Sequence, residues 1–78
     1  MDIYLSRHAR NRVKKFRISP QEVRETIDMP DFTEPSEKGR QNAWKKKGNR
    51  YIRVTYLKEE AEIVVITVTL KERPARRG

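Results

Sequence analysis

The sequence predicts an α+β fold in which an N-terminal helical hairpin packs on an antiparallel sheet of three to four strands. Two observations support this prediction. Two segments near the N-terminus each follow a serine that suits a helix cap, and each repeats apolar residues at helical spacing. From residue 41 onward, turn residues separate segments rich in β-branched and aromatic residues, which is typical of strands. We therefore expect one helical layer on one face of a sheet.

The first helix is expected to begin after Ser6, its N-cap, and to end near Phe16. Its apolar positions fall on one stripe, formed by Leu5, Ala9, Val13 and Phe16. His8 and Arg12 are four residues apart, so they lie on one side of the helix at the border of that stripe. The preceding residues 3–5 fit either a short edge strand or the approach to the helix.

The second helix carries the most specific local signal in the chain. Ser19 suits the N-cap, Pro20 suits the first helical position, and Glu22 is placed to close a capping box. The helix is expected to end near Met29, because Pro30 disfavours helical backbone in the residue before it. This pattern predicts a helix and carries no information about activity.

The strands begin after a linker. A short edge strand is expected at residues 32–34, since Pro35 and Gly39 bracket it. Residues 41–47 form the next expected strand, and Gly48–Asn49 is a two-residue hairpin turn into the strand that follows.

The hairpin at residues 50–70 holds most of the β-branched residues, and its register decides what Arg53 faces. A two-residue turn would put polar Thr67 on the apolar side of the first strand. A three-residue loop at Glu59–Ala61 instead aligns the apolar faces and puts Arg53 opposite Thr67, so we favour it. Counting back through the preceding turn places Trp44 opposite Arg53. The polar face of the sheet is then expected to gather Trp44, Lys46, Tyr51, Arg53, Thr55 and Thr67.

The composition suits one small domain, residues 1–78, whose basic end at 71–78 is expected to be a flexible tail. The net charge is +8, from nineteen Lys and Arg against eleven Asp and Glu. A positive field of this size suits nucleic acid, an anionic membrane or an acidic protein as partner.

Several classes of site are missing from the sequence. The chain has no cysteine, which excludes disulfides, thiolate-bound zinc and a cysteine nucleophile. It shows no metal-ligand spacing and no Gly-rich phosphate loop, so neither a metal nor a small-molecule cofactor is expected. No signal peptide or membrane-spanning stretch is visible, so we expect a soluble cytoplasmic protein without a membrane partner.

Two patterns together resemble a known group of proteins. The segment S-R-H-A-R-N-R-V-K-K-F-R-I-S-P-Q-E-V is followed by the strand segments R-Y-I-R-V-T-Y and I-V-V-I-T-V. From Ser6 to about Leu70, the chain resembles a small uncharacterised bacterial and archaeal domain family related to the BrnT and RelE toxins, whose fold is shared with barnase-like ribonucleases. Unlike RelE toxins, this chain has neither Tyr nor His after Leu70.

The resemblance implies a RelE/barnase-like toxin fold and the toxin of a toxin–antitoxin pair. Such a toxin cleaves RNA without a metal and is blocked by a small antitoxin with an acidic tail. The recurring residues of the family carry over to this chain as the catalytic candidates His8, Arg12, Arg53 and Thr67.

The residues themselves suggest how such a site would work. Arg53, beside Lys46 and Thr67, would cradle a phosphate, because the planar guanidinium matches phosphate oxygens. Trp44 and Tyr51 would stack unpaired bases, or would instead shield the stem of Arg53. The candidates for nucleic-acid binding are Trp44, Lys45, Lys46, Tyr51 and Arg73.

His8 and Arg12 each allow two interpretations. His8 is the only histidine and could transfer protons near neutral pH, or it could hydrogen-bond a backbone carbonyl and fix helix against sheet. Arg12 could hold phosphate, or could pair with Glu22 or Glu25. If the helices cover the apolar face, both residues could reach Arg53 only around a sheet edge.

The sequence therefore favours a toxin-like protein that binds RNA or the ribosome and is a possible endoribonuclease. Two alternatives stay open: a non-catalytic nucleic-acid-binding or ribosome-binding module, and a protein-interaction module that docks an acidic partner.

Overall fold

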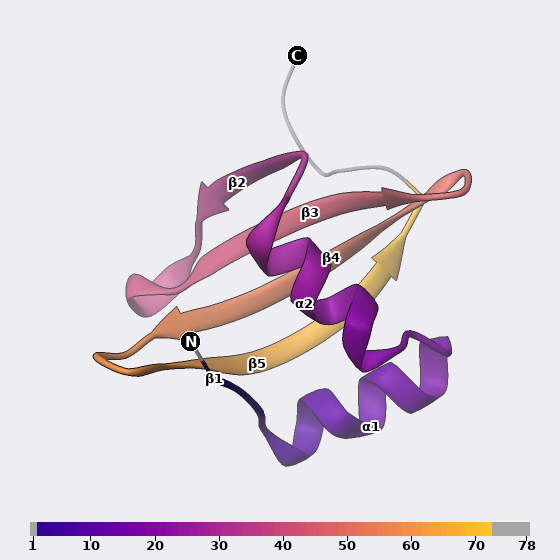
Figure 1. Cartoon of the computed structure of the whole chain (residues 1–78). Helices are drawn as coiled ribbons and strands as arrows, with labels where there is room; N and C mark the ends of the chain where they lie inside the picture. The colour runs from indigo at the N-terminus through magenta and orange to yellow at the C-terminus, as the bar shows by residue number, and fades with distance from the viewer. Residues whose placement is uncertain (1, 73–78) are drawn as a thin grey trace.

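The structure is a computed structural model that describes residues 2–72, in which two helices lie on a five-stranded sheet (Figure 1). The elements in chain order are β1 (Asp2–Leu5), α1 (Arg7–Phe16), α2 (Pro20–Asp28), β2 (Phe32–Pro35), the short 3-10 helix η1 (Glu37–Gly39), β3 (Gln41–Lys47), β4 (Arg50–Lys58) and β5 (Glu62–Lys71). The strands lie side by side in the order β1-β5-β4-β3-β2.

The domain is α+β, but the prediction of an antiparallel sheet of three to four strands is wrong. Strands β2 to β5 form the antiparallel part, and β1 adds a fifth strand that pairs in parallel with β5. Ile3 lies opposite Ile63 in this pairing. The parallel partner was not predictable from local signals, because four residues at one end of the chain pair with a strand about sixty residues away.

Side-chain caps fix the beginning of both helices as the sequence predicts. Ser6 Oγ accepts a hydrogen bond from the backbone N–H of Ala9 at 3.1 Å, and it donates to the carbonyl of Ile66 at 3.0 Å. This residue therefore starts α1 and also ties it to β5. At α2 the capping box is confirmed, since Ser19 and Glu22 each bind the backbone N–H of the other at 3.1 and 2.9 Å.

The β3–β4 hairpin has the predicted register. Trp44 lies opposite Arg53, and Lys46 lies opposite Tyr51. The turn between these strands contains Gly48 with a φ of 63°, a left-handed conformation that glycine adopts without steric cost.

The β4–β5 hairpin differs from its predicted register. Arg53 lies opposite Thr69, and Thr67 lies opposite Thr55. A bulge where the register shifts next to Thr55 leaves Ile66 as an extra residue in β5. Side chains of a regular strand alternate strictly between its two faces. The extra residue at the bulge shifts this alternation by one, so that apolar residues both before and after the bulge face the helices.

The core lies between the two helices and one face of the sheet. Its buried members are Ala9, Ile18 and Val23 from the helical layer and Ile52, Val54, Ile63, Val65 and Val68 from β4 and β5. Successive side chains of a strand alternate between faces, so the residues between these strand positions lie on the opposite face. We call that opposite side the helix-free face, because neither helix in residues 2–72 packs on it. Neither helix is long and apolar enough to cross a membrane.

Candidate functional site

The helix-free face carries its polar side chains in rows that run across the strands. Such rows arise because paired residues on neighbouring strands point to the same side. We call Glu34, Asn42, Thr55 and Thr67 the amide row. We call Phe32, Trp44, Arg53 and Thr69 the arginine row. We call Lys46, Tyr51 and Lys71 the lysine row.

The amide row binds itself together with hydrogen bonds. Thr55 Oγ1, on a side chain that is 7% exposed, donates to Asn42 Oδ1 at 2.6 Å. Asn42 Nδ2 donates to Glu34 Oε2 at 3.2 Å, and the indole N–H of Trp44 donates to the same oxygen at 3.0 Å. This network ties β2, β3 and β4 together and occupies the polar groups of its members.

The arginine row is built around Trp44, which is only 1% exposed. Its ring stacks on Phe32 with centroids 5.7 Å apart and an angle of 12° between the planes. On its other cross-strand side, the guanidinium carbon of Arg53 lies 5.7 Å from the indole centroid. The indole is thus not available to stack a base. Its contacts match the alternative interpretation, in which it supports the Arg53 side chain.

Two polar atoms of the arginine row have no partner. Arg53 Nε and Thr69 Oγ1 are buried and form no hydrogen bond within the part of the chain that the structure describes. The two residues lie directly opposite each other in the β4–β5 pairing, and Thr69 is 9% exposed. A buried polar atom without a partner costs about 1–3 kcal/mol, and more when the group is charged.

The lysine row lies two residues along the strands from the arginine row, towards the β3–β4 turn. Tyr51 is half-buried and has Lys46 and Lys71 as its cross-strand neighbours. The backbone N–H of Lys46 donates to Asp31 at 2.7 Å, which fixes the strand while leaving the lysine side chain exposed.

His8 and Arg12 are not brought together with Arg53. They lie on α1, whose apolar residues pack on the other face of the sheet. The side chain of His8 is exposed and makes no hydrogen bond with residues 2–72, so its bond to a backbone carbonyl considered above is not formed. The guanidinium of Arg12 lies over Phe16, at 5.2 Å from its centroid, and pairs with no carboxylate of the described residues. Its Nε is a third buried polar atom without a partner.

The remaining candidates among residues 2–72, except those of the arginine and lysine rows, also do not lie beside Arg53. Thr67 lies in the amide row rather than opposite Arg53. Lys45 faces the helical side, where its Nζ donates to the carbonyl of Met29 at 2.9 Å and so caps the end of α2. Arg73 lies outside the described residues, as does most of the expected tail at 71–78, whose first residue Lys71 is the last residue of β5.

The sequence interpretation missed Glu34, Asn42 and Thr69. A signal for Glu34 was present, because a tryptophan in a sheet usually needs an acceptor for its indole N–H. Thr69 was missed because its position opposite Arg53 depends on the bulge and on the turn, where Lys58 pairs with Ile63 rather than with Glu62. Among residues 2–72 no three metal-ligating side chains come together.

One ion pair near the start of α2 shifts a pKa outside this site. The pKa of Glu22 is lowered, first by the hydrogen bond from Lys47 and then by the backbone N–H of Ser19. Because Glu22 belongs to the α2 capping box, this ion pair supports the helix and the end of β3 rather than the helix-free face.

Comparison with known proteins gives one match. The sequence model of a family described as a domain of unknown function, DUF4258, matches residues 5–69. Neither the curated proteins nor the solved structures contain a match to the chain.

Proposed function

Because the chain belongs to the DUF4258 family, whose function is unknown, we propose from its own residues that it binds RNA on the helix-free face and holds a backbone phosphate at Arg53 and Thr69. The observation that carries this proposal is the cross-strand pair of buried polar atoms without partners, Arg53 Nε and Thr69 Oγ1. Both can donate a hydrogen bond to a phosphate oxygen.

The surroundings of Arg53 support a phosphate ligand. The indole ring of Trp44 lies beside the guanidinium, and Phe32 stacks on that ring, so the cation is held in place before any ligand arrives. No carboxylate of residues 2–72 pairs with Arg53, so its charge is available. A planar guanidinium forms charge-assisted hydrogen bonds with two phosphate oxygens at once.

Two further features favour RNA among the phosphate-bearing ligands. The net charge of +8 attracts a polyanion more strongly than a single small phosphate. Tyr51, which is half-buried between Lys46 and Lys71, can stack an unpaired base next to the phosphate at Arg53. This arrangement suits single strands, whose bases are free to stack on aromatic side chains.

Cleavage of that RNA by a toxin-like mechanism, with an acidic antitoxin as inhibitor and the cytoplasm as location, is a stricter form of the proposal. Metal-independent cleavage needs a proton-transferring group within hydrogen-bond reach of the reacting phosphate. His8 projects from α1 on the other side of the sheet. Binding is therefore the function that the geometry supports best.

The test compares the affinity of variants for a short single-stranded RNA by fluorescence anisotropy. Arg53→Met keeps an unbranched apolar stem but removes the guanidinium, and it should weaken binding about tenfold or more, since a hydrogen bond to a charged group contributes roughly 1.5–3 kcal/mol. Lys58→Met is the matched control, because it removes one exposed positive charge at the far end of β4. Equal affinities for wild type and Arg53→Met would remove the proposal. Incubation of the RNA with the protein in EDTA tests metal-independent cleavage. If the RNA stays intact, the proposal is restricted to binding.

A further inference from the structure

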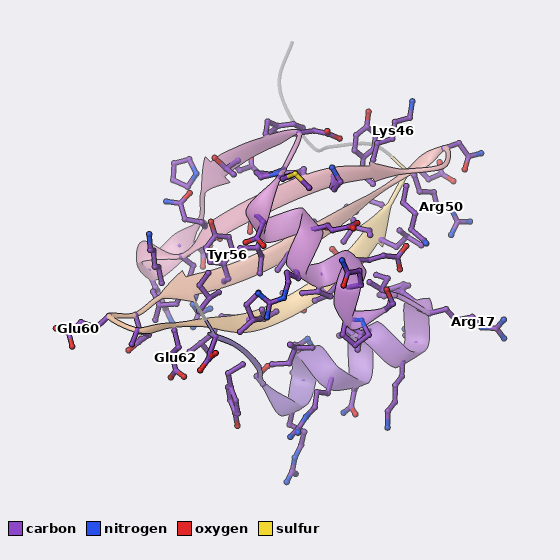
Figure 2. The ribbon with its side chains drawn as sticks, viewed as in Figure 1. Arg17, Lys46, Arg50, Tyr56, Glu60 and Glu62 are labelled. Atoms are coloured by element: carbon purple, nitrogen blue, oxygen red, sulfur yellow. The ribbon has the colours of Figure 1, made fainter. Side chains whose placement is uncertain are left out.

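Side chains of opposite charge gather at the two ends of the sheet, with Lys58 beside the acidic group and Asp31 beside the basic group. Figure 2 shows Lys46 and Arg50 at one end and Glu60 and Glu62 at the other. We call the first the basic end, whose members are Lys46, Arg50 and Lys71. We call the second the acidic end, whose members are Asp2, Glu59, Glu60 and Glu62. The strand register places them at opposite ends, because Lys71 pairs with Tyr51 near the start of β4 whereas the acidic turn follows its last residue.

From this separation we infer that the RNA strand runs in one direction only, from Arg53 across the lysine row and off the sheet at the basic end. The inference rests on the proposed function, and it adds the path and the extent of the bound strand. It predicts a short, one-sided footprint on a single strand.

The spacing of the rows fits successive phosphates. Arg53 and Tyr51 are two residues apart on β4, so the arginine row and the lysine row are about 7 Å apart. Neighbouring phosphates of an extended single strand can match that distance. A phosphate at Arg53 and Thr69 would therefore place the next one between Lys46 and Lys71, with the ring of Tyr51 between these two lysines for a base.

The other direction along the sheet is unsuited to a polyanion. Beyond the amide row, the helix-free face continues with Leu57, Val64 and Tyr4, which are paired across β4, β5 and β1. The next pair along is Asp2 with Glu62, close to the acidic turn. Leu57 and Val64 give phosphates no donors, and the carboxylates repel them.

Not every lysine near the basic end takes part. Lys47 is already bound to Glu22, and Lys45 is bound to the carbonyl of Met29 on the other side of the sheet. The run K-K-K in β3 therefore contributes one free ammonium to the helix-free face, that of Lys46. A binding mode that depended only on charge density would instead use all three.

The first experiment measures how affinity for single-stranded RNA depends on salt. The double variant Lys46→Gln/Lys71→Gln should lower the slope of log affinity against log salt by about 0.7, since the path places one phosphate between these lysines and each phosphate neutralised on a single strand contributes about 0.7. The double variant Lys38→Gln/Lys58→Gln removes the same charge from exposed positions outside the path and should leave the slope unchanged. Equal losses in both would show that only net charge matters and would overturn the path. If Arg53→Met still weakened binding in that case, the proposed function would stand without the proposed path of the strand.

The second experiment uses the absence of cysteine from the chain. A single cysteine carrying a fluorophore is introduced in either of two exposed turns, as Asn49→Cys next to the basic end or Glu60→Cys at the acidic end. RNA should change the fluorescence of the label at position 49 and leave that at position 60 unchanged. Equal responses at both positions, or a response only at position 60, would overturn the path. No binding by either labelled protein or by wild type would overturn both the path and the proposed function.

Discussion

The amide row and the arginine row lie two residues apart on the same four strands, yet they treat their polar atoms differently. In the amide row, Thr55, Asn42 and Glu34 satisfy one another in a chain of hydrogen bonds. In the arginine row, Arg53 Nε and Thr69 Oγ1 face each other across two strands without partners.

The comparison separates a row whose polar groups bind one another from a row in which two polar atoms lack partners. A buried hydrogen-bond network stabilises the sheet only when its members are satisfied. A buried cation without a partner reduces stability unless something binds it. Trp44 links the two rows, because its N–H is bound to Glu34 while its ring supports Arg53.

The largest expected effect on stability follows from removing that link. Trp44→Ala should lower the free energy of unfolding by about 3–5 kcal/mol, because it leaves a cavity at a side chain that is 1% exposed. Urea unfolding followed by circular dichroism measures it. Trp44→Phe is the control and should lose less, since it keeps a ring against Phe32 and loses the bond to Glu34. A loss below about 1 kcal/mol for Trp44→Ala would contradict the described packing.

The next effect compares the two rows directly. Asn42→Ala should lower the free energy of unfolding by about 1–3 kcal/mol, because it leaves the buried hydroxyl of Thr55 without its acceptor. Thr69→Val removes a hydroxyl that already lacks a partner, so it should be neutral or stabilising. The same urea titration serves for both variants. If Thr69→Val destabilised the protein as much as Asn42→Ala, the distinction between the rows would not hold.

The smallest effect belongs to the helix-covered side. The pKa of Glu22 is lower in the folded protein than its ordinary value, so the ionised form stabilises the fold above that ordinary value. This contribution should be lost as the pH falls from the ordinary value through the lowered pKa and the carboxylate takes up a proton. Glu22→Gln should therefore flatten the acid side of the stability profile, by at most about 1 kcal/mol for an exposed pair. If Glu22→Gln and wild type lost the same free energy of unfolding at acid pH, other carboxylates would account for the pH dependence.

Local chemistry made some elements predictable from the sequence. Ser6, Ser19 and Glu22 cap their helices through bonds that span only three residues. The turn at Gly48–Asn49 sets the register of β3 against β4 by itself, which is why the pairing of Trp44 with Arg53 could be counted in advance.

The features that were missed depend on distant contacts. Residues 63–66 of β5 are all apolar, so this segment has no alternation that would reveal the bulge at Ile66. The parallel pairing of β1 required the position of β5 to be known first. Thr69 could be placed beside Arg53 only after that bulge was known, and Glu34 could be placed beside Asn42 and Trp44 only after the edge strand β2 was registered on β3.

The most direct test of the arginine row observes the Nε–H group of Arg53 by nuclear magnetic resonance. Protein labelled with nitrogen-15 is titrated with the short single-stranded RNA, and the resonance is assigned through its loss in Arg53→Met. If a phosphate supplies the missing acceptor, this resonance shifts and saturates together with binding. A resonance that stays in place while RNA binding saturates would show that Arg53 does not hold the phosphate.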